Sequence, residues 1–154
     1  MKPKSTPDPS SLRERALGYL ARREHSRFEL TRKLEAAGFG LEAIRPTLDA
    51  FEEKGWLSDR RFAESWIADH RARHGRIRLA YDLRQRGVNE TLIEAALDAN
   101  PDGELERARQ VWEKKFGAPP RDAAEKAKQM RFLQGRGFTP EIIRRAMGRS
   151  ACPG

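Results

Sequence analysis

Leu83-Arg84-Gln85-Arg86-Gly87-Val88, the LRQRGV segment of residues 83–88, is the stretch that decides the fold of this chain. A glycine directly after a helix end can take the left-handed conformation that closes the helix. The apolar residue that follows it, Val88, then packs back on Leu83, four residues before the glycine. Because Asn89 is an acceptable N-cap, a new helix can begin at once. The segment therefore predicts two helices joined by a tight hinge at Gly87.

The sequence pattern of this hinge occurs three times along the chain. Each copy keeps a spacing of four, one, five and four residues, and its glycines, Gly38, Gly87 and Gly137, are 49 and then 50 positions apart. The three sets are Leu34, Gly38, Phe39, Ile44 and Leu48; Leu83, Gly87, Val88, Ile93 and Leu97; and Leu133, Gly137, Phe138, Ile143 and Met147. Self-similarity at a fixed period is the signature of a repeat architecture.

We therefore predict an all-α fold of three tandem three-helix modules that form an elongated molecule. No run alternates apolar and polar residues for long enough to predict a strand. Capping boxes at Ser11 with Glu14 and at Ser26 with Glu29 mark two helix starts in the first module. The predicted organisation is a disordered tail, modules one, two and three, and a second tail, over residues 1–10, 11–57, 58–100, 101–148 and 149–154. An Asn100-Pro101 turn ends the second module.

Composition places the chain among charge-rich soluble proteins. Its 154 residues are 38% hydrophobic and 35% charged, and no apolar run approaches the roughly 20 residues that span a bilayer. Residues 1–10 hold three prolines and no apolar run, which is not the pattern of a secretory signal. Cys152 is the only cysteine, so an intrachain disulfide is impossible. We expect a cytoplasmic protein without membrane contact.

The positive charge is concentrated in the second and third modules. The formal net charge is +8 and the isoelectric point is near 10.1. Residues 71–88 carry six arginines against Asp82 alone, and residues 121–149 carry eight basic residues against three acidic ones. Such a balance favours a polyanionic partner.

Helical phasing suggests where that partner binds. If Ile77, Leu79, Ala80 and Leu83 face the core, the opposite face presents Arg78 and Tyr81, with Asp82 and Arg84 on its flanks. The alternative is a solvated helix surface on which Arg78 and Arg86 pair with Asp82. The third module repeats the basic face with two residues and adds two arginines on its last helix. The predicted contact residues are Arg78, Tyr81, Arg84, Lys128 and Arg131, supported by Arg76, Arg144 and Arg145.

Two other classes of function are less well supported by the sequence. His70 and His74 have the spacing of metal ligands on a helix, but no carboxylate completes a metalloprotease pattern, so we read them as solvated surface residues. We find no catalytic constellation, no metal site and no cofactor motif, and predict that the protein is not an enzyme. Three short helices also resemble helix-turn-helix operator readers, but the third helices of modules one and two are acidic, which phosphates would repel.

Several strings together resemble the RecX family of bacterial regulatory proteins. They cover roughly residues 12–147 in order. They are Arg22-Arg23-Glu24-His25-Ser26-Arg27, Gly55-Trp56-Leu57, Arg61-Phe62-Ala63, Leu83-Arg84-Gln85-Arg86-Gly87, Arg131-Phe132-Leu133 and Arg136-Gly137-Phe138. One departure is Gly75-Arg76, where the family often has a Gly-Pro pair.

The resemblance implies a regulator of the RecA recombinase. Such a protein would bind the RecA–DNA filament in its groove, suppress ATP hydrolysis and strand exchange, and so modulate DNA repair, recombination and the SOS response. The implied partners are RecA and single-stranded DNA, with double-stranded DNA as a further candidate, and the expected state is a monomer. The alternative function is a sequence-independent nucleic-acid-binding helical protein that has no recombinase partner.

Overall fold

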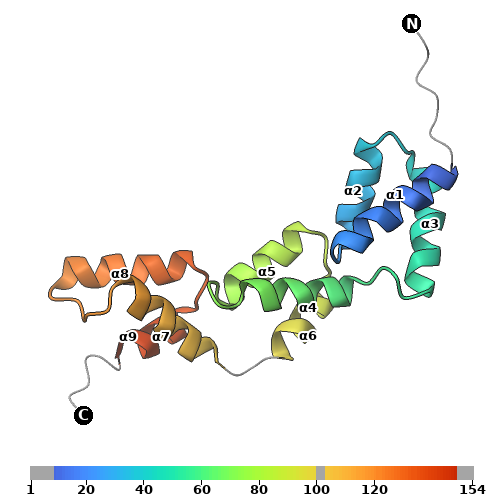
Figure 1. Cartoon of the computed structure of the whole chain (residues 1–154). Coiled ribbons are helices and arrows are strands. Elements are labelled where there is room, and N and C mark those ends of the chain that lie inside the picture. The colour runs from blue at the N-terminus through green and yellow to red at the C-terminus, as the bar shows by residue number, and fades with distance from the viewer. Residues whose placement is uncertain (1–8, 100–102, 149–154) are drawn as a thin grey trace, which may run out of the picture.

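A computed structural model of the 154-residue chain describes residues 9–99 and 103–148, and within these ranges every regular element is an α-helix. The helices follow one another in groups of three along an elongated molecule (Figure 1). In chain order they are α1 (Pro9–Arg22), α2 (Arg27–Ala36), α3 (Leu41–Glu53), α4 (Asp59–His70), α5 (Arg76–Gln85), α6 (Glu90–Asp98), α7 (Glu104–Lys115), α8 (Ala123–Gly135) and α9 (Pro140–Gly148). The predicted all-α fold of three tandem three-helix modules is confirmed.

Each predicted hinge has the hydrogen bonds of a Schellman motif. At the second hinge the Val88 amide donates to the Leu83 carbonyl over 3.1 Å, and the Gly87 amide donates to the Arg84 carbonyl over 3.1 Å. Gly87 has a φ of 80°, as the sequence predicts. The same two bonds close α2 at Gly38 and α8 at Gly137. Because these bonds are local, the hinge residues alone specify where the second helix of a module ends and the third begins.

Each module has its own hydrophobic core. The core of the first module is built from α1, α2 and α3, and its centre is formed by Leu30, Leu34 and Leu48, which are fully buried. The second core forms in the same way around Leu79 and Leu83, and the third around Leu133 and Phe138. Helices pack mainly within their own module. The molecule is therefore a row of three small domains.

The helix starts agree with the predicted caps in all but one case. The Ser26 and Glu29 capping box is present, and Asn89 caps α6. However, α1 begins at Pro9, so Ser11 lies inside the helix, and the prediction that it caps α1 is wrong. The terminal segments 1–8 and 149–154, which include Cys152, and the predicted Asn100-Pro101 turn lie outside the described residues. In the described part of the chain, no helix has the length and apolar character that crossing a membrane requires.

The phasing predicted for α5 is wrong at two positions. Ile77, expected in the core, is 53% exposed, whereas Asp82, expected on an exposed flank, is only 8% exposed. Leu79 and Leu83 define the buried face as expected, but Ile77 is two residues before Leu79 and so points to the opposite side of the helix. Asp82 is three residues after Leu79 and falls on the buried side.

Candidate nucleic-acid interface

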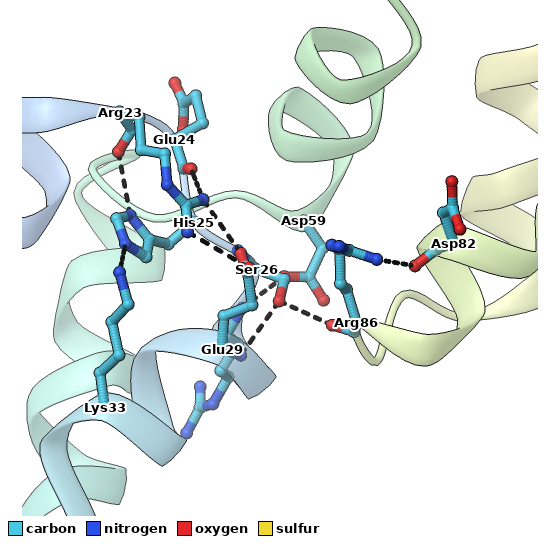
Figure 2. Close-up of polar contacts among 10 residues, drawn as sticks. Arg23, Glu24, His25, Ser26, Glu29, Lys33, Asp59, Asp82 and Arg86 are labelled. Carbon is cyan, nitrogen blue, oxygen red and sulfur yellow. Dashed lines mark hydrogen bonds and ion pairs between the residues drawn. The ribbon is translucent and has the colours of Figure 1, made fainter. Parts of the chain in front are cut away.

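The first two modules are joined where the second hinge meets the start of α2. The Ser26 side chain is buried, accepts a hydrogen bond from the Glu29 amide over 3.1 Å, and donates its hydroxyl to the Arg86 carbonyl over 2.7 Å (Figure 2). A carboxylate oxygen of Asp59, the first residue of α4, accepts a bond from the Arg27 amide over 2.7 Å. The second module thus supplies two acceptors to the N-terminal end of α2.

The third module docks on the second in the same manner. The Gly75 amide donates to the Arg136 carbonyl over 2.8 Å, and the Ile77 amide donates to the Gly137 carbonyl over 3.0 Å. A carboxylate oxygen of Glu104, the first residue of α7, accepts a bond from the Arg76 amide over 3.1 Å. A Cβ at Gly75 would lie 2.6 Å from the Gly137 oxygen, so this approach requires glycine. The amide of Arg76, which a proline would lack, is also used in this joint.

A buried histidine supports the first joint. His25 is 1% exposed; its Nδ1 lies 3.0 Å from the Arg23 carbonyl and its Nε2 lies 2.8 Å from the Lys33 ammonium nitrogen (Figure 2). Lys33 can only donate, so Nε2 accepts and the proton sits on Nδ1. Burial lowers the pKa of His25, which keeps the ring neutral in this arrangement. The ring orders the loop that presents Ser26.

The predicted arginines of the second module are all paired with carboxylates. Arg76 binds Glu94 over 2.7 Å and Asp98 over 3.0 Å, both on α6. Arg78 binds Asp82 over 3.1 Å, the pair that the solvated-surface alternative predicts. Arg84 pairs with Glu90. The side chains of Arg78 and Arg84 nevertheless remain 45% and 51% exposed.

Arg86 does not pair with the Asp82 carboxylate in the way that alternative proposes. Its guanidinium donates to the Asp82 backbone carbonyl over 2.9 Å and lies 3.8 Å from the centroid of the Trp66 ring. On the same helix as Trp66, the His70 ring stacks on it at 3.9 Å, and the His74 ring lies parallel to that of His70 at 6.1 Å. The two histidines are therefore half-buried in a ring stack, and the prediction that they are solvated is wrong. Within residues 9–99 and 103–148 no group of three or more His, Cys, Asp or Glu is placed to hold a metal ion.

Tyr81 and the basic residues of the third module lie on the surface. Tyr81 is 52% exposed and shares one side of α5 with the exposed Ile77. In Figure 1, α5 and α8 follow one another along the upper edge of the second and third modules. The four predicted third-module residues are exposed and form no ion pair with any residue that the structure describes; they are Lys128, Arg131, Arg144 and Arg145.

The structure also forms a basic groove between the second and third modules that was not predicted. Its volume is about 550 Å³, and no carboxylate lines it. The wall includes the half-buried ring of Phe132, over which the Lys115 ammonium and the Arg136 guanidinium lie at 5.5 and 5.1 Å from the ring centroid. The residues that line this basic groove are Ala72, Arg73, Gln110, Val111, Lys114, Lys115, Phe132 and Arg136. A groove with four cations and no acid suits phosphate groups.

No sequence signal brings these cations together. Arg73 belongs to the turn after α4, whereas Lys114 and Lys115 end α7, about 40 residues later. Helical periodicity relates residues within one helix only, so it could not have placed Arg73 beside α7. The docking of the third hinge on Gly75 creates the groove.

Comparisons with known proteins agree with this architecture. Three family models match in chain order: the first three-helix domain of RecX over residues 13–50, the second over 58–97 and the third over 102–147. The chain belongs to the RecX family. The resemblance seen in the sequence is thereby confirmed.

Individual members of the RecX family match most of the chain. Regulatory protein RecX of Herbaspirillum seropedicae is 46% identical over 141 residues, which cover 90% of each chain. Regulatory protein RecX of Ralstonia nicotianae is 44% identical over 140 residues, covering 89% of this chain and 86% of the relative. The crystal structure of RecX from Lactobacillus salivarius superposes with a TM-score of 0.80 at 20% identity, over 93% of this chain and 96% of the other. This likeness supports the fold of three tandem modules.

Proposed function

We propose that this RecX-family regulator binds the RecA–DNA filament and inhibits ATP hydrolysis and strand exchange by the recombinase. It would act in the cytoplasm as a monomer, without a cofactor or catalysis of its own, and so modulate DNA repair, recombination and the SOS response. This proposal rests on membership of the RecX family. The row of modules is consistent with it, because its basic groove is lined by four cations and no carboxylate.

Two regions are proposed to meet DNA or acidic protein surface. The first is the edge formed by α5 and α8, where Arg78, Tyr81 and Arg84 are followed by Lys128 and Arg131. The second is the basic groove, whose cations face no acid. Arg144 and Arg145 on α9 would support binding. Arg76 would act indirectly, because its guanidinium is held by Glu94 and Asp98 of α6.

Such a distribution favours several weak contacts over one strong site. Modules joined in a row can contact a filament at successive points, and each further contact then forms at a high effective concentration. Contacts from cations to phosphates carry no base sequence information, so we expect binding that is nearly independent of sequence and strongly weakened by salt.

The central experiment adds the purified protein to RecA on single-stranded DNA and follows ATP hydrolysis. We expect hydrolysis to fall while DNA sites are still in excess over the protein, and the protein alone to hydrolyse no ATP. Inhibition that disappears when DNA is in large excess supports the alternative function of a nucleic-acid-binding protein without a recombinase partner. Absence of inhibition at every ratio refutes both the partner and the mechanism.

Variants separate the two proposed regions. Removing Arg78 and Arg84 together, or Lys114 and Lys115 together, by alanine substitution should lower the log–log salt slope of single-strand binding by about 0.7 for each phosphate that the variant no longer binds. The control replaces Arg15 and Arg22, two exposed residues of α1, with alanine. This control changes the net charge equally and should leave the slope unchanged. If the salt slope falls equally in the control, binding depends only on the net charge of the protein and not on the two proposed regions.

A further inference from the structure

In the first two modules the same ion pair ties the start of the second helix to the end of the third. Arg27 binds Asp49 over 2.7 Å in the first module. Arg76, 49 positions later, binds Asp98 over 3.0 Å in the second. Asp49 and Asp98 are also 49 positions apart, so the pair belongs to the repeat. It closes the space between the two helices of each module.

The third module lacks this pair. With the 50-residue spacing of the third copy, the equivalents of Arg76 and Asp98 are Lys126 and Gly148, so the carboxylate of Asp98 has no counterpart there. The residue equivalent to Glu94, the second partner of Arg76, is Arg144. Relative to the second module, the third thus has a glycine and a base in place of two acids; the first module also has a base, Arg45, at the position of Glu94. Neither Lys126 nor Arg144 forms an ion pair within the described residues.

An open groove occupies the place of the missing pair. This terminal groove lies between α8 and α9 and has a volume of about 790 Å³. Apolar side chains form most of its wall, Met130 among them at 43% exposure, and Glu141 is its only carboxylate. Lys126, Arg144 and Gly148 are among its lining residues.

We propose that the terminal groove binds an acidic, amphipathic peptide segment of a partner protein. A carboxylate of the segment would take the place that Asp98 has in the second module and pair with Lys126 and Arg144. Apolar residues one helical turn away would cover Met130. The internal ion pairs of modules one and two show that a carboxylate in this position is compatible with the fold.

The chemistry of the terminal groove favours a peptide over nucleic acid. Two cations line it, against four in the basic groove, and most of its other lining residues are apolar and give a phosphate no charged partner. The proposal goes beyond the proposed function and does not depend on it, since the groove is tested without RecA or its filament.

The test measures fluorescence anisotropy of a labelled synthetic helix-forming peptide with the full chain. The peptide carries leucines at positions i, i+3 and i+7 and glutamates beside them, and its twin carries glutamine in place of each glutamate. Because a hydrogen bond to a charged group contributes more than one to a neutral group, we expect the twin to bind about tenfold more weakly. Equal binding of the two peptides would overturn the proposal, as would complete displacement of the acidic peptide by a thymidine oligonucleotide.

A second experiment restores the ion pair inside the third module and tests the terminal groove more specifically than the peptide comparison does. The double variant Lys126→Arg, Gly148→Asp re-creates the pair of the other modules, and a Cβ at Gly148 meets no atom within 4 Å. We expect it to fold like the parent by circular dichroism and to bind the acidic peptide about tenfold more weakly, since the internal carboxylate competes for the cations. The control Lys126→Arg, Gly148→Asn has the same shape without the charge and should bind like the parent.

A third variant keeps the test decisive if the double variant fails to fold. Arg144→Glu reverses one exposed cation and should weaken the acidic peptide at least as much. Binding that survives both Arg144→Glu and the restored pair would overturn the proposal. Self-association that both variants abolish would overturn it too, because the occupant would then be a second copy of this chain.

Discussion

Gly87 serves two purposes at once. Its φ of 80° closes α5 and starts the turn into α6. Its Cα also approaches Phe28 of the first module so closely that a Cβ there would overlap the Phe28 side chain. The sequence predicts only the first of these, because the second depends on how two modules dock. Gly18 offers a contrast, since it lies within α1 and a Cβ there meets no atom within 4 Å.

At the residue scale we predict opposite effects of the same substitution. Gly87→Ala should lower the free energy of unfolding by about 1–3 kcal/mol, since the left-handed conformation is strained for alanine and the added methyl meets Phe28. Gly18→Ala should raise it by about 0.5–1 kcal/mol, because glycine within a helix is destabilising. Urea denaturation followed by circular dichroism measures both. A destabilised Gly18→Ala or an unaffected Gly87→Ala would contradict this account of the hinge.

At the element scale, ion pairs explain why the third helices of the first two modules are acidic. The acidic residues of α3 and α6 suggest, in sequence alone, surfaces that repel phosphate. In the structure, Asp49 and Glu52 hold Arg27, and Glu94 and Asp98 hold Arg76. These carboxylates therefore attach the second helix of each module to the third. In α9 the residues that correspond to Glu94 and Asp98 are Arg144 and Gly148, and Arg144 forms no ion pair with any residue that the structure describes.

We predict that Arg76 and Asp98 are energetically coupled. A double-mutant cycle of Arg76→Ala and Asp98→Ala should give a coupling of about 0.2–1 kcal/mol, the range of pairs that solvent partly screens. The side chains are 35% and 67% exposed, so a larger value is not expected. The matched cycle of Lys126→Ala and Gly148→Ala, at the equivalent positions of the third module, should give none. Equal coupling in both cycles would show that the ion pair does not distinguish the modules.

At the scale of the whole molecule, two joints of the same design set the shape. In each joint, a hinge carbonyl and a carboxylate of one module accept hydrogen bonds at the start of the preceding module's second helix. The first joint uses the Ser26 hydroxyl as donor, whereas the second uses the Gly75 amide directly. The second joint therefore brings two backbones together and creates the basic groove beside it.

We predict that Ser26→Ala loosens the first joint. Loss of the hydroxyl removes the cap of α2 and the donor to the Arg86 carbonyl, which should cost about 1–2 kcal/mol of stability. Spin labels at Arg15→Cys in α1 and Ser65→Cys in α4, with Cys152→Ser, would report a broader distance distribution between the modules. The control Ser11→Ala, an exposed position of α1, should leave the distribution unchanged. If Ser26→Ala does not broaden the distance distribution, the other contacts of the first joint hold the two modules in place without the Ser26 hydroxyl.

Local interactions made much of the fold readable from sequence. The hinges at Gly38, Gly87 and Gly137 and the caps at Ser26 and Asn89 depend on hydrogen bonds between residues a few positions apart. Such bonds join neighbours in sequence, so three copies of the hinge pattern predict three modules, although the same capping-box spacing at Ser11 and Glu14 does not cap α1. The family strings are likewise a property of the sequence itself. Together they determine the secondary structure, the repeat and family membership.

Contacts between distant residues were decided only by the tertiary structure. Asp82 is buried because α5 packs with that side of the helix toward the rest of the second module; its partner Arg78 is only four residues away, so the ion pair is local but the burial is not. Arg73 and Lys114 line one groove only because the third hinge docks on Gly75. The terminal groove exists because no ion pair closes α8 on α9. The physical reason is common to all three: the packing of one helix against another decides which sides meet, and periodicity within a single helix carries no information about that packing.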